Sequence, residues 1–118
     1  MNAVNMQKIR KQLAVIGGGP AGVCAAITAA RHGIQTVLVT DRPVLGGNSS
    51  SEIRVWTRGA TGAGNIWAEE MGVWGELKLE NFYRNPDANP VFWDETLLDA
   101  VLREKNLTLL LNTEVYDA

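Results

Sequence analysis

Apolar and polar positions divide the first part of the chain into a strand, a helix and a second strand. Residues 13–16 are an apolar run that glycine ends, and residues 36–40 are β-branched and apolar. Both are predicted as strands, the first of them buried in a parallel sheet. Residues 20–32 between them are rich in alanine, with Pro20 suited to the first helical position and Gly33 to the residue past the end. This order predicts a βαβ unit and an α/β fold.

The pattern weakens after the second strand and then returns. Residues 42–66 are rich in glycine and have few apolar runs, which predicts a long loop of the kind that often carries function. Helices are predicted over residues 75–84 and 90–105, the second with one apolar face. Residues 107–118 are predicted to form one or two strands.

Length and composition are typical of one soluble globular domain, with 118 residues, 46% hydrophobic residues and a formal charge of -2. The near-neutral charge gives no reason to expect nucleic acid or an acidic membrane surface as a partner. Cys24 is the only cysteine, so neither a disulfide framework nor a cysteine metal cluster is expected. Residues 1–12 are polar and basic, which predicts an N-terminal extension rather than a signal peptide, and a cytoplasmic location is expected.

Three glycines indicate the chemistry of the first loop. Gly17, Gly19 and Gly22 have G-x-G-x-x-G spacing, after a predicted strand and at the start of a predicted helix. In that context the first permits a tight turn, the second lets the backbone approach a pyrophosphate, and the third lets the helix pack closely on the strand. The helix N-terminus offers unpaired N–H groups to the phosphates. Asp41 follows the second strand, where an acidic side chain can accept hydrogen bonds from ribose hydroxyls.

This pattern predicts a dinucleotide site but leaves the dinucleotide open. Asp41 would repel a 2′-phosphate, which disfavours NADP, although Arg42 beside it weakens that argument. FAD and NAD share their ADP half, so the βαβ unit does not separate them. The next segment favours FAD, because Gly46 and Gly47 offer further backbone N–H groups and residues 48–51 offer side chains that could hydrogen-bond a ligand. A flexible surface loop is the alternative interpretation of that segment.

Four stretches of the sequence carry a family resemblance: VIGGGPAGVCAAITAARHG, VLVTD, LGGNSSSEIRVW and LTLLLNTEVYDA. They resemble the start of an FAD-dependent oxidoreductase of the glutathione-reductase-like superfamily, and in particular FAD-dependent dehydrogenases with a GGN-S-S-S-E-I-R segment. The resemblance implies FAD as cofactor and a Rossmann-like FAD-binding domain. Similar enzymes need a later strand and a second glycine–acid motif, so residues 13–118 are expected to be the N-terminal part of that domain.

The resemblance also implies which residues bind the cofactor: Gly17, Gly19, Pro20 and Ala21 along the pyrophosphate; Asp41 and Arg42 at the ribose and adenine; Gly46, Gly47, Asn48 and Ser49 toward the flavin; and Val115, by its backbone, at the adenine. Asp41 stands where glutamate is more common, which shortens the reach and keeps the charge. Arg54 is a further candidate, because a cation near the flavin stabilises the negative charge that builds up during reduction. No catalytic residue, metal site or substrate is assigned.

Two alternative functions remain as hypotheses, together with one expectation about the isolated chain. The chain could be an NAD-binding module of a dehydrogenase, or a non-catalytic fold remnant with an interaction role. The isolated chain is expected to self-associate, because an incomplete sheet leaves an unpaired edge and uncovered apolar surface, notably around Trp56, Trp67 and Trp74.

Overall fold

The computed structural model describes residues 5–58, 64–65, 68–69 and 71–118. In chain order its elements are β1 (Leu13–Ile16), α1 (Pro20–Arg31), β2 (Thr36–Val39), the 3-10 turn η1 (Gly47–Ser49), α2 (Gly72–Arg84), α3 (Pro90–Leu102) and β3 (Leu107–Leu110). The three strands form one parallel sheet in the order β1-β2-β3. The predicted α/β fold with a parallel, Rossmann-like arrangement is confirmed.

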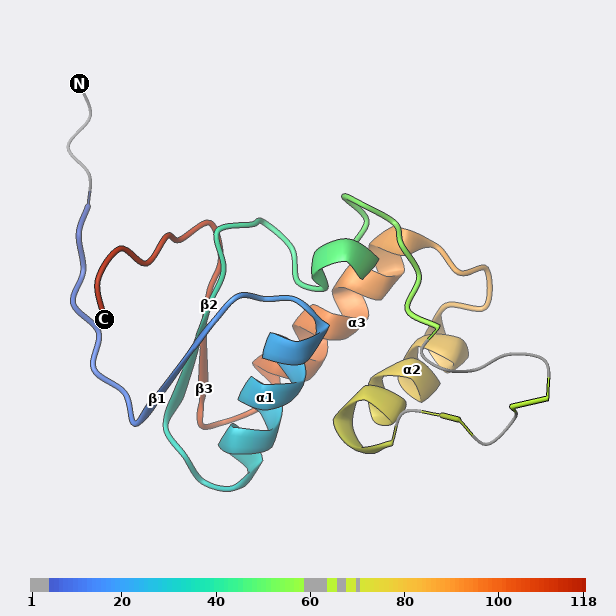
Figure 1. Ribbon diagram of the computed structural model, residues 1–118, viewed down its shortest axis with the longest axis horizontal. Coiled ribbons are helices and arrows are strands. Elements are labelled where there is room, and N and C mark those ends of the chain that lie inside the picture. The colour runs from blue at the N-terminus through green and yellow to red at the C-terminus, as the bar shows by residue number, and fades with distance from the viewer. Residues whose placement is uncertain (1–4, 59–63, 66–67, 70) are drawn as a thin grey trace.

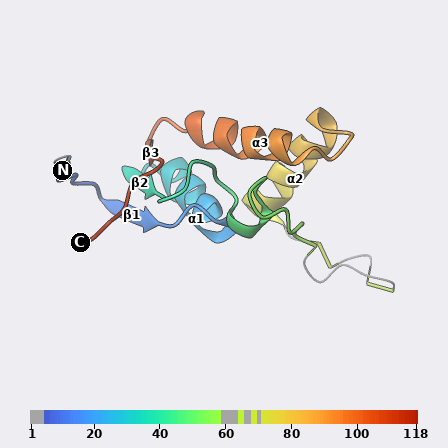
Figure 2. The ribbon, with the colours of Figure 1, turned by 90° about the horizontal axis from the view of Figure 1, so that it is seen from above.

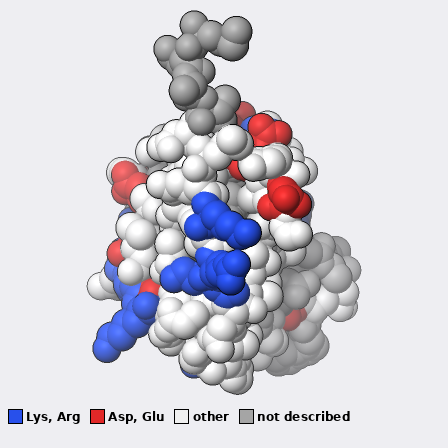
Figure 3. Space-filling model, turned by 90° about the vertical axis from the view of Figure 1, so that its left-hand side faces the viewer, with Lys and Arg blue, Asp and Glu red and all other residues white. Residues whose placement is uncertain are grey.

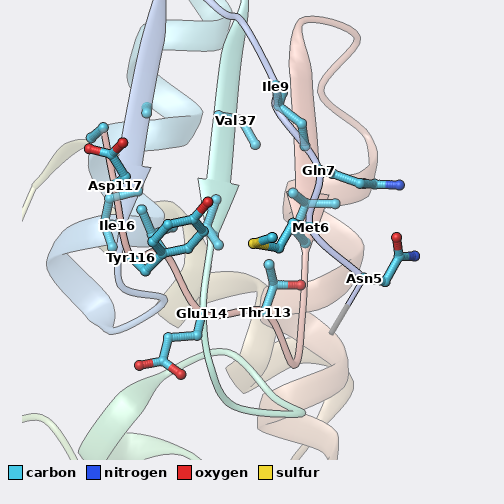
Figure 4. A pocket seen from close by; sticks show the side chains of 15 residues that line it. Asn5, Met6, Gln7, Ile9, Ile16, Val37, Thr113, Glu114, Tyr116 and Asp117 are labelled. Atoms are coloured by element: carbon cyan, nitrogen blue, oxygen red, sulfur yellow. The ribbon is translucent and has the colours of Figure 1, made fainter. Parts of the chain in front are cut away.

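The helices lie on one side of this sheet. Figures 1 and 2 show α1 and α3 against the same sheet face, with α2 packed on these two helices away from the strands. On the opposite face, residues of the two chain ends, among them Met6 and Tyr116, line a cavity together with Ile16 and Val37 of the sheet (Figure 4). One covered and one open face give the three-stranded sheet a single packed core.

The central strand, rather than the first, is the buried one. Every residue of β2 is buried, whereas Leu13 and Ile16 of β1 are 37% and 57% exposed. The prediction that β1 is buried is therefore wrong. The physical reason is that β1 lies at the edge of the sheet formed by the described strands, and Ile16 lines the face opposite the described helices.

Most predicted boundaries are close, and two of them differ by three residues. Helix α2 begins at Gly72 instead of residue 75, and α3 ends at Leu102 instead of residue 105. Residues 107–118 contain one strand, β3, which agrees with the predicted one or two strands. The chain then stays beside β2 without regular structure, because Thr113 N–H still donates to the carbonyl of Thr40 at 3.0 Å.

The core is formed by one face of each helix and by β2. Ile27 of α1, Leu38 of β2 and Leu97 of α3 are fully buried, and Trp93 is 2% exposed. Trp74 is only 8% exposed and meets Trp93 edge to face, with ring centroids 5.4 Å apart. The expectation of uncovered apolar surface around Trp74 is therefore wrong, because α2 turns this ring inward.

Of the other two tryptophans in that expectation, Trp56 is 42% exposed and Trp67 lies outside the described residues. Within the described part of the chain, no helix combines the length and apolar character needed to cross a bilayer. The cytoplasmic location stays a prediction.

Gly22 sets how closely α1 approaches the turn that follows β1. A Cβ atom at this position would stand 1.9 Å from the carbonyl oxygen of Gly17 and 3.6 Å from Cγ1 of Val15. The first distance is far below a van der Waals contact, so any side chain here would push the helix away from the strand. The close helix packing predicted for Gly22 is confirmed.

We expect Gly22→Ala to lower the free energy of unfolding of the full-length protein by roughly 1–3 kcal/mol, the usual cost of forcing extra atoms into a packed site. Gly19→Ala is the matched control, because a Cβ there would meet nothing within 4 Å. Both variants are compared as ligand-free protein, because a ligand that binds only the folded state would raise its stability. Thermal or urea unfolding measures both. Equal stability of the two variants would show that the contact at Gly22 relaxes freely.

Arg31, at the end of α1, joins three elements at the surface. Its guanidinium binds Glu76 of α2 and, through Nε, Glu104 in the turn before β3, each at 2.7 Å. Hydrogen bonding to Arg31 lowers the pKa of the Glu76 carboxyl below its usual range. The side chains of Arg31 and Glu76 are 40% and 54% exposed, so solvent screening keeps the contribution to stability small.

We expect Arg31→Gln to lower the free energy of unfolding at pH 7 by about 0.5–1 kcal/mol. A carboxyl whose pKa is lower in the folded than in the unfolded state stabilises the fold at pH values above its unfolded-state pKa. This stabilisation is lost as the pH falls through the folded-state pKa. The difference from the parent protein should therefore shrink in acid. Unfolding measured from pH 7 to pH 3 tests this, with exposed Arg10→Gln as control for the lost charge. A difference that stays constant over that range would contradict the assignment.

Candidate dinucleotide-binding site

The glycine loop, residues 17–19, connects β1 to the first turn of α1. It is anchored by the Gly17 N–H, which donates to the carbonyl of Val39 at 2.8 Å. Gly19 caps the helix in an extended conformation and contributes no side chain, and Pro20 begins the helix. The first helical hydrogen bond runs from Val23 N–H to the carbonyl of Gly19 at 2.9 Å. The N–H groups before it point out of the helix end, where the positive end of the helix dipole favours an anion.

Space is available at this helix end. A Cβ on Gly19 would meet nothing within 4 Å, whereas one on Gly18 would stand 2.8 Å from Cδ2 of Leu45 and 3.0 Å from Cβ of Thr40. Gly18 therefore faces the protein, and Gly19 faces the open side. A ligand can approach the backbone at Gly19 without displacing a side chain.

The serine loop, residues 46–51, contacts the glycine loop directly. Gly46 N–H donates to the carbonyl of Gly18 at 2.8 Å. A Cβ on Gly47 would stand 3.2 Å from the Cα of Gly19. Both loop glycines have positive φ, 107° at Gly46 and 53° at Gly47, a conformation that other residues adopt only with strain. The structure thus brings the two predicted glycine segments together at the start of α1.

The polar residues of the serine loop have different environments. Ser49 is buried, and its hydroxyl donates to the carbonyl of Gly46 at 2.8 Å while accepting from Nε1 of Trp93 at 3.0 Å. Asn48 is exposed, and its carbonyl accepts from Val55 N–H at 2.8 Å. The hydroxyl of Ser50 is fully buried and has no hydrogen-bond partner within the part of the chain that the structure describes. The Ser49 hydroxyl therefore shapes the loop from inside.

The predicted ribose and adenine residues lie at the end of β2. Asp41 is exposed directly after the strand. Arg42 is held on both sides, since its Nη1 binds Glu52 at 3.1 Å and its carbonyl accepts from Asn112 N–H at 3.1 Å. Asp41 is thus available to a ligand, and Arg42 is already engaged in an exposed ion pair.

The remaining two candidates lie farther along the chain. Arg54 is exposed, has a φ of 64°, and its Nε donates to the carbonyl of Ser51 at 2.9 Å, which ties it to the serine loop. Val115 lines a cavity of about 420 Å³ on the open sheet face. Figure 4 shows Tyr116 and Met6 reaching toward each other across that cavity.

The site described so far fits a pyrophosphate. It combines a helix N-terminus without a side-chain cap, an accessible glycine backbone and a second glycine loop in contact with the first. The donors are backbone N–H groups, which bind phosphate oxygens without adding a side chain.

Helix α3 contributes to this site in a way that the sequence did not reveal. Besides Trp93, Asp94 contacts the serine loop, its Oδ1 accepting from Ser51 N–H at 2.9 Å. The sequence signal was limited to the apolar face of the predicted helix. Linear spacing does not relate residues 93 and 94 to a loop more than 40 positions earlier.

A model of the FAD dependent oxidoreductase family matches residues 12–118. The chain belongs to this family. FAD is therefore the cofactor that the family assignment indicates, and it favours a flavin site over an NAD site.

Three relatives support the assignment of this FAD dependent oxidoreductase chain. An NADH oxidase of Thermoanaerobacter brockii is 46% identical over 44 residues, which is 37% of this chain and 7% of that protein. A dihydrolipoyl dehydrogenase of Bacillus subtilis is 43% identical over 54 residues, 46% of this chain and 12% of that protein. A 3-oxosteroid 1-dehydrogenase of Mycolicibacterium smegmatis is 31% identical over 96 residues, 81% of this chain and 15% of that protein.

The three alignments cover only 7% to 15% of the relatives. The chain therefore spans a small part of their length. No solved structure matches it.

Proposed function

We propose that this chain binds the ADP and pyrophosphate half of FAD in a flavin-dependent oxidoreductase of the glutathione-reductase-like superfamily, which acts on a small-molecule substrate. The observation that carries the proposal is the contact between the two glycine loops beside an accessible Gly19 and an uncapped helix end. Residues 13–118 form the N-terminal part of the FAD-binding domain in this proposal, after an extension of residues 1–12.

In this proposal the pyrophosphate lies at the start of α1. Gly19 and Ala21 face it with backbone N–H groups, Gly17 shapes the turn, and Pro20 begins the helix without a clashing N–H. Gly47 borders the same space from the serine loop. The negative charge of the phosphates is balanced by the positive end of the helix dipole and by the partial positive charges of these backbone N–H groups.

The adenosine end lies toward β2 and the chain that follows β3. The exposed carboxylate of Asp41 accepts hydrogen bonds from the ribose hydroxyls. Arg42 lies beside the adenine, with its guanidinium positioned by Glu52. Val115, in the segment after Thr113, meets the adenine through its backbone.

The flavin end lies beyond the serine loop. When bound, FAD exchanges a hydride or an electron pair with the substrate. Gly46, Gly47, Asn48 and Ser49 continue the binding surface in that direction. Arg54, anchored on the carbonyl of Ser51, places a positive charge on the same side of the site, where it stabilises negative charge on the ring.

Gly19→Val in the full-length protein tests the phosphate assignment. The position has extended backbone and open space, so valine fits the fold but fills the volume reserved for the pyrophosphate. We expect at least a hundredfold weaker FAD binding with unchanged circular dichroism; about 2.7 kcal/mol corresponds to that factor. Bound flavin is measured by its visible absorbance and mass, and affinity by titration of the apoprotein.

Ala25→Val is the control, since residue 25 is exposed on the same helix beyond the first turn and ends with the same valine side chain. It should purify with the flavin content of the parent. FAD binding by Gly19→Val at parental affinity would overturn the phosphate assignment. A colourless full-length parent that does not bind FAD would favour the non-catalytic alternative.

We also propose that the partner of the isolated 118-residue chain is a second copy of itself. Ile16, Met6 and Tyr116 are 57%, 68% and 78% exposed at the open sheet face. Figure 3 views the molecule from this side and shows basic side chains in the middle, with acidic ones toward the upper margins. Two copies meeting through this face bury apolar surface and bring like charges together.

We therefore expect the isolated chain to form a dimer that tightens at higher ionic strength and binds FAD weakly. Sedimentation at several protein and salt concentrations measures the first property, and FAD titration the second. A monomer at all concentrations, or stoichiometric tight FAD binding, would contradict this expectation. Tyr116→Ser should weaken the dimer, whereas Thr28→Ser, on the exposed side of α1, should not.

A further inference from the structure

Helix α3 contacts the serine loop at three buried positions. Trp93, Asp94 and Leu97 are 2%, 7% and 0% exposed. Trp93 and Asp94 hydrogen-bond the loop through the Ser49 hydroxyl and the Ser51 N–H. Cδ1 of Leu97 lies 2.9 Å from where a Cβ on Gly46 would stand. One short stretch of α3 thus meets the loop near its start, middle and end.

The Ser49 hydroxyl connects the helix to the loop backbone. It accepts from the Trp93 indole and donates to the carbonyl of Gly46. This bond orients the peptide between Gly46 and Gly47, both of which have positive φ. The same peptide region packs on Gly19, so the orientation set by α3 reaches the space proposed for the pyrophosphate.

Trp93 is itself held in place by aromatic neighbours. Its ring centroid lies 5.7 Å from that of Trp56 and 5.4 Å from that of Trp74. Packing between two rings restricts the direction of the indole N–H, which is what a fixed hydrogen-bond donor requires. Asp94 supplies a second fixed group, a buried carboxylate on the Ser51 N–H.

We propose that Trp93 and Asp94 are positioning residues of the FAD site, which hold residues 46–51 in the shape that the cofactor binds. This inference rests on the proposed function. The contacts on the loop come from within the protein, so both residues act through the serine loop and do not touch the cofactor. Their loss should weaken FAD binding more than it weakens the fold.

The first test compares four variants of the full-length protein: Trp93→Phe, Ser49→Ala, their double variant and the control Thr96→Val. Phenylalanine keeps a ring between Trp56 and Trp74 but lacks the indole donor. We expect each of the first two to weaken FAD binding roughly threefold to tenfold, the effect of one hydrogen bond. The double variant should bind about as weakly as the poorer single variant, because both changes break the same link.

Thr96→Val is the control. It removes a buried hydroxyl of α3 that donates to the carbonyl of Phe92 at 2.9 Å, a hydrogen bond within the helix that does not involve the serine loop. It should bind FAD within about twofold of the parent, because the lost hydrogen bond is not one that holds the loop. Apoprotein melting temperatures are measured in parallel. Variants that lose stability but bind FAD like the parent would overturn the inference, since they would show a merely structural role.

The second test uses Asp94. Asp94→Asn keeps an oxygen that accepts from the Ser51 N–H, whereas Asp94→Ala removes it. Affinity for FAD should fall in the alanine variant and stay near the parental value in the asparagine variant. Equal FAD affinity of all Trp93, Ser49 and Asp94 variants, with loss of binding in Gly19→Val, would overturn the positioning role alone. Parental affinity in Gly19→Val would remove the proposed function and this inference together.

Discussion

Helix α1 packs against the turn that leaves β1 so closely that Gly22 has no room for a side chain. At Gly22 the helix lies so near the carbonyl of Gly17 that even a methyl group does not fit. This contact fixes where α1 begins and how its first turn points. Because the proposed anion site consists of backbone N–H groups at that turn, its position follows from the packing of helix on strand. The proposed ligand binding and the stability of the fold therefore both depend on the absence of a side chain at Gly22.

The second loop depends on the first and on a helix that comes much later in the chain. The hydrogen bond from Gly46 to Gly18 joins the two loops, and α3 holds the second from behind. A loop with two consecutive glycines in the left-handed region has many other conformations available. The buried contacts with Trp93 and Asp94 restrict it to one, which reduces the entropy lost when a ligand binds.

Apolar side chains and charged side chains connect the elements of this fold at different depths. The core joins helices and sheet through residues such as Ile27, Leu38 and Leu97, whereas the ion pair between Arg31 and Glu76 joins two helices at the surface. Exposed pairs contribute little individually, so burial of the apolar faces provides most of the stability. In the proposed site, backbone dipoles bind the phosphates, and the exposed carboxylate of Asp41 binds the ribose.

The sequence by itself determined the local elements and the dinucleotide pattern. The apolar run at β1, the alanine-rich α1 and the β-branched β2 depend on neighbours within a few positions, and G-x-G-x-x-G spacing depends on a single turn. The tertiary structure decided that β1 is exposed at an edge, that Trp74 turns inward and that α3 shapes the serine loop. These outcomes depend on contacts between residues far apart in the chain. The linear pattern identifies an apolar face but does not specify which partner covers it.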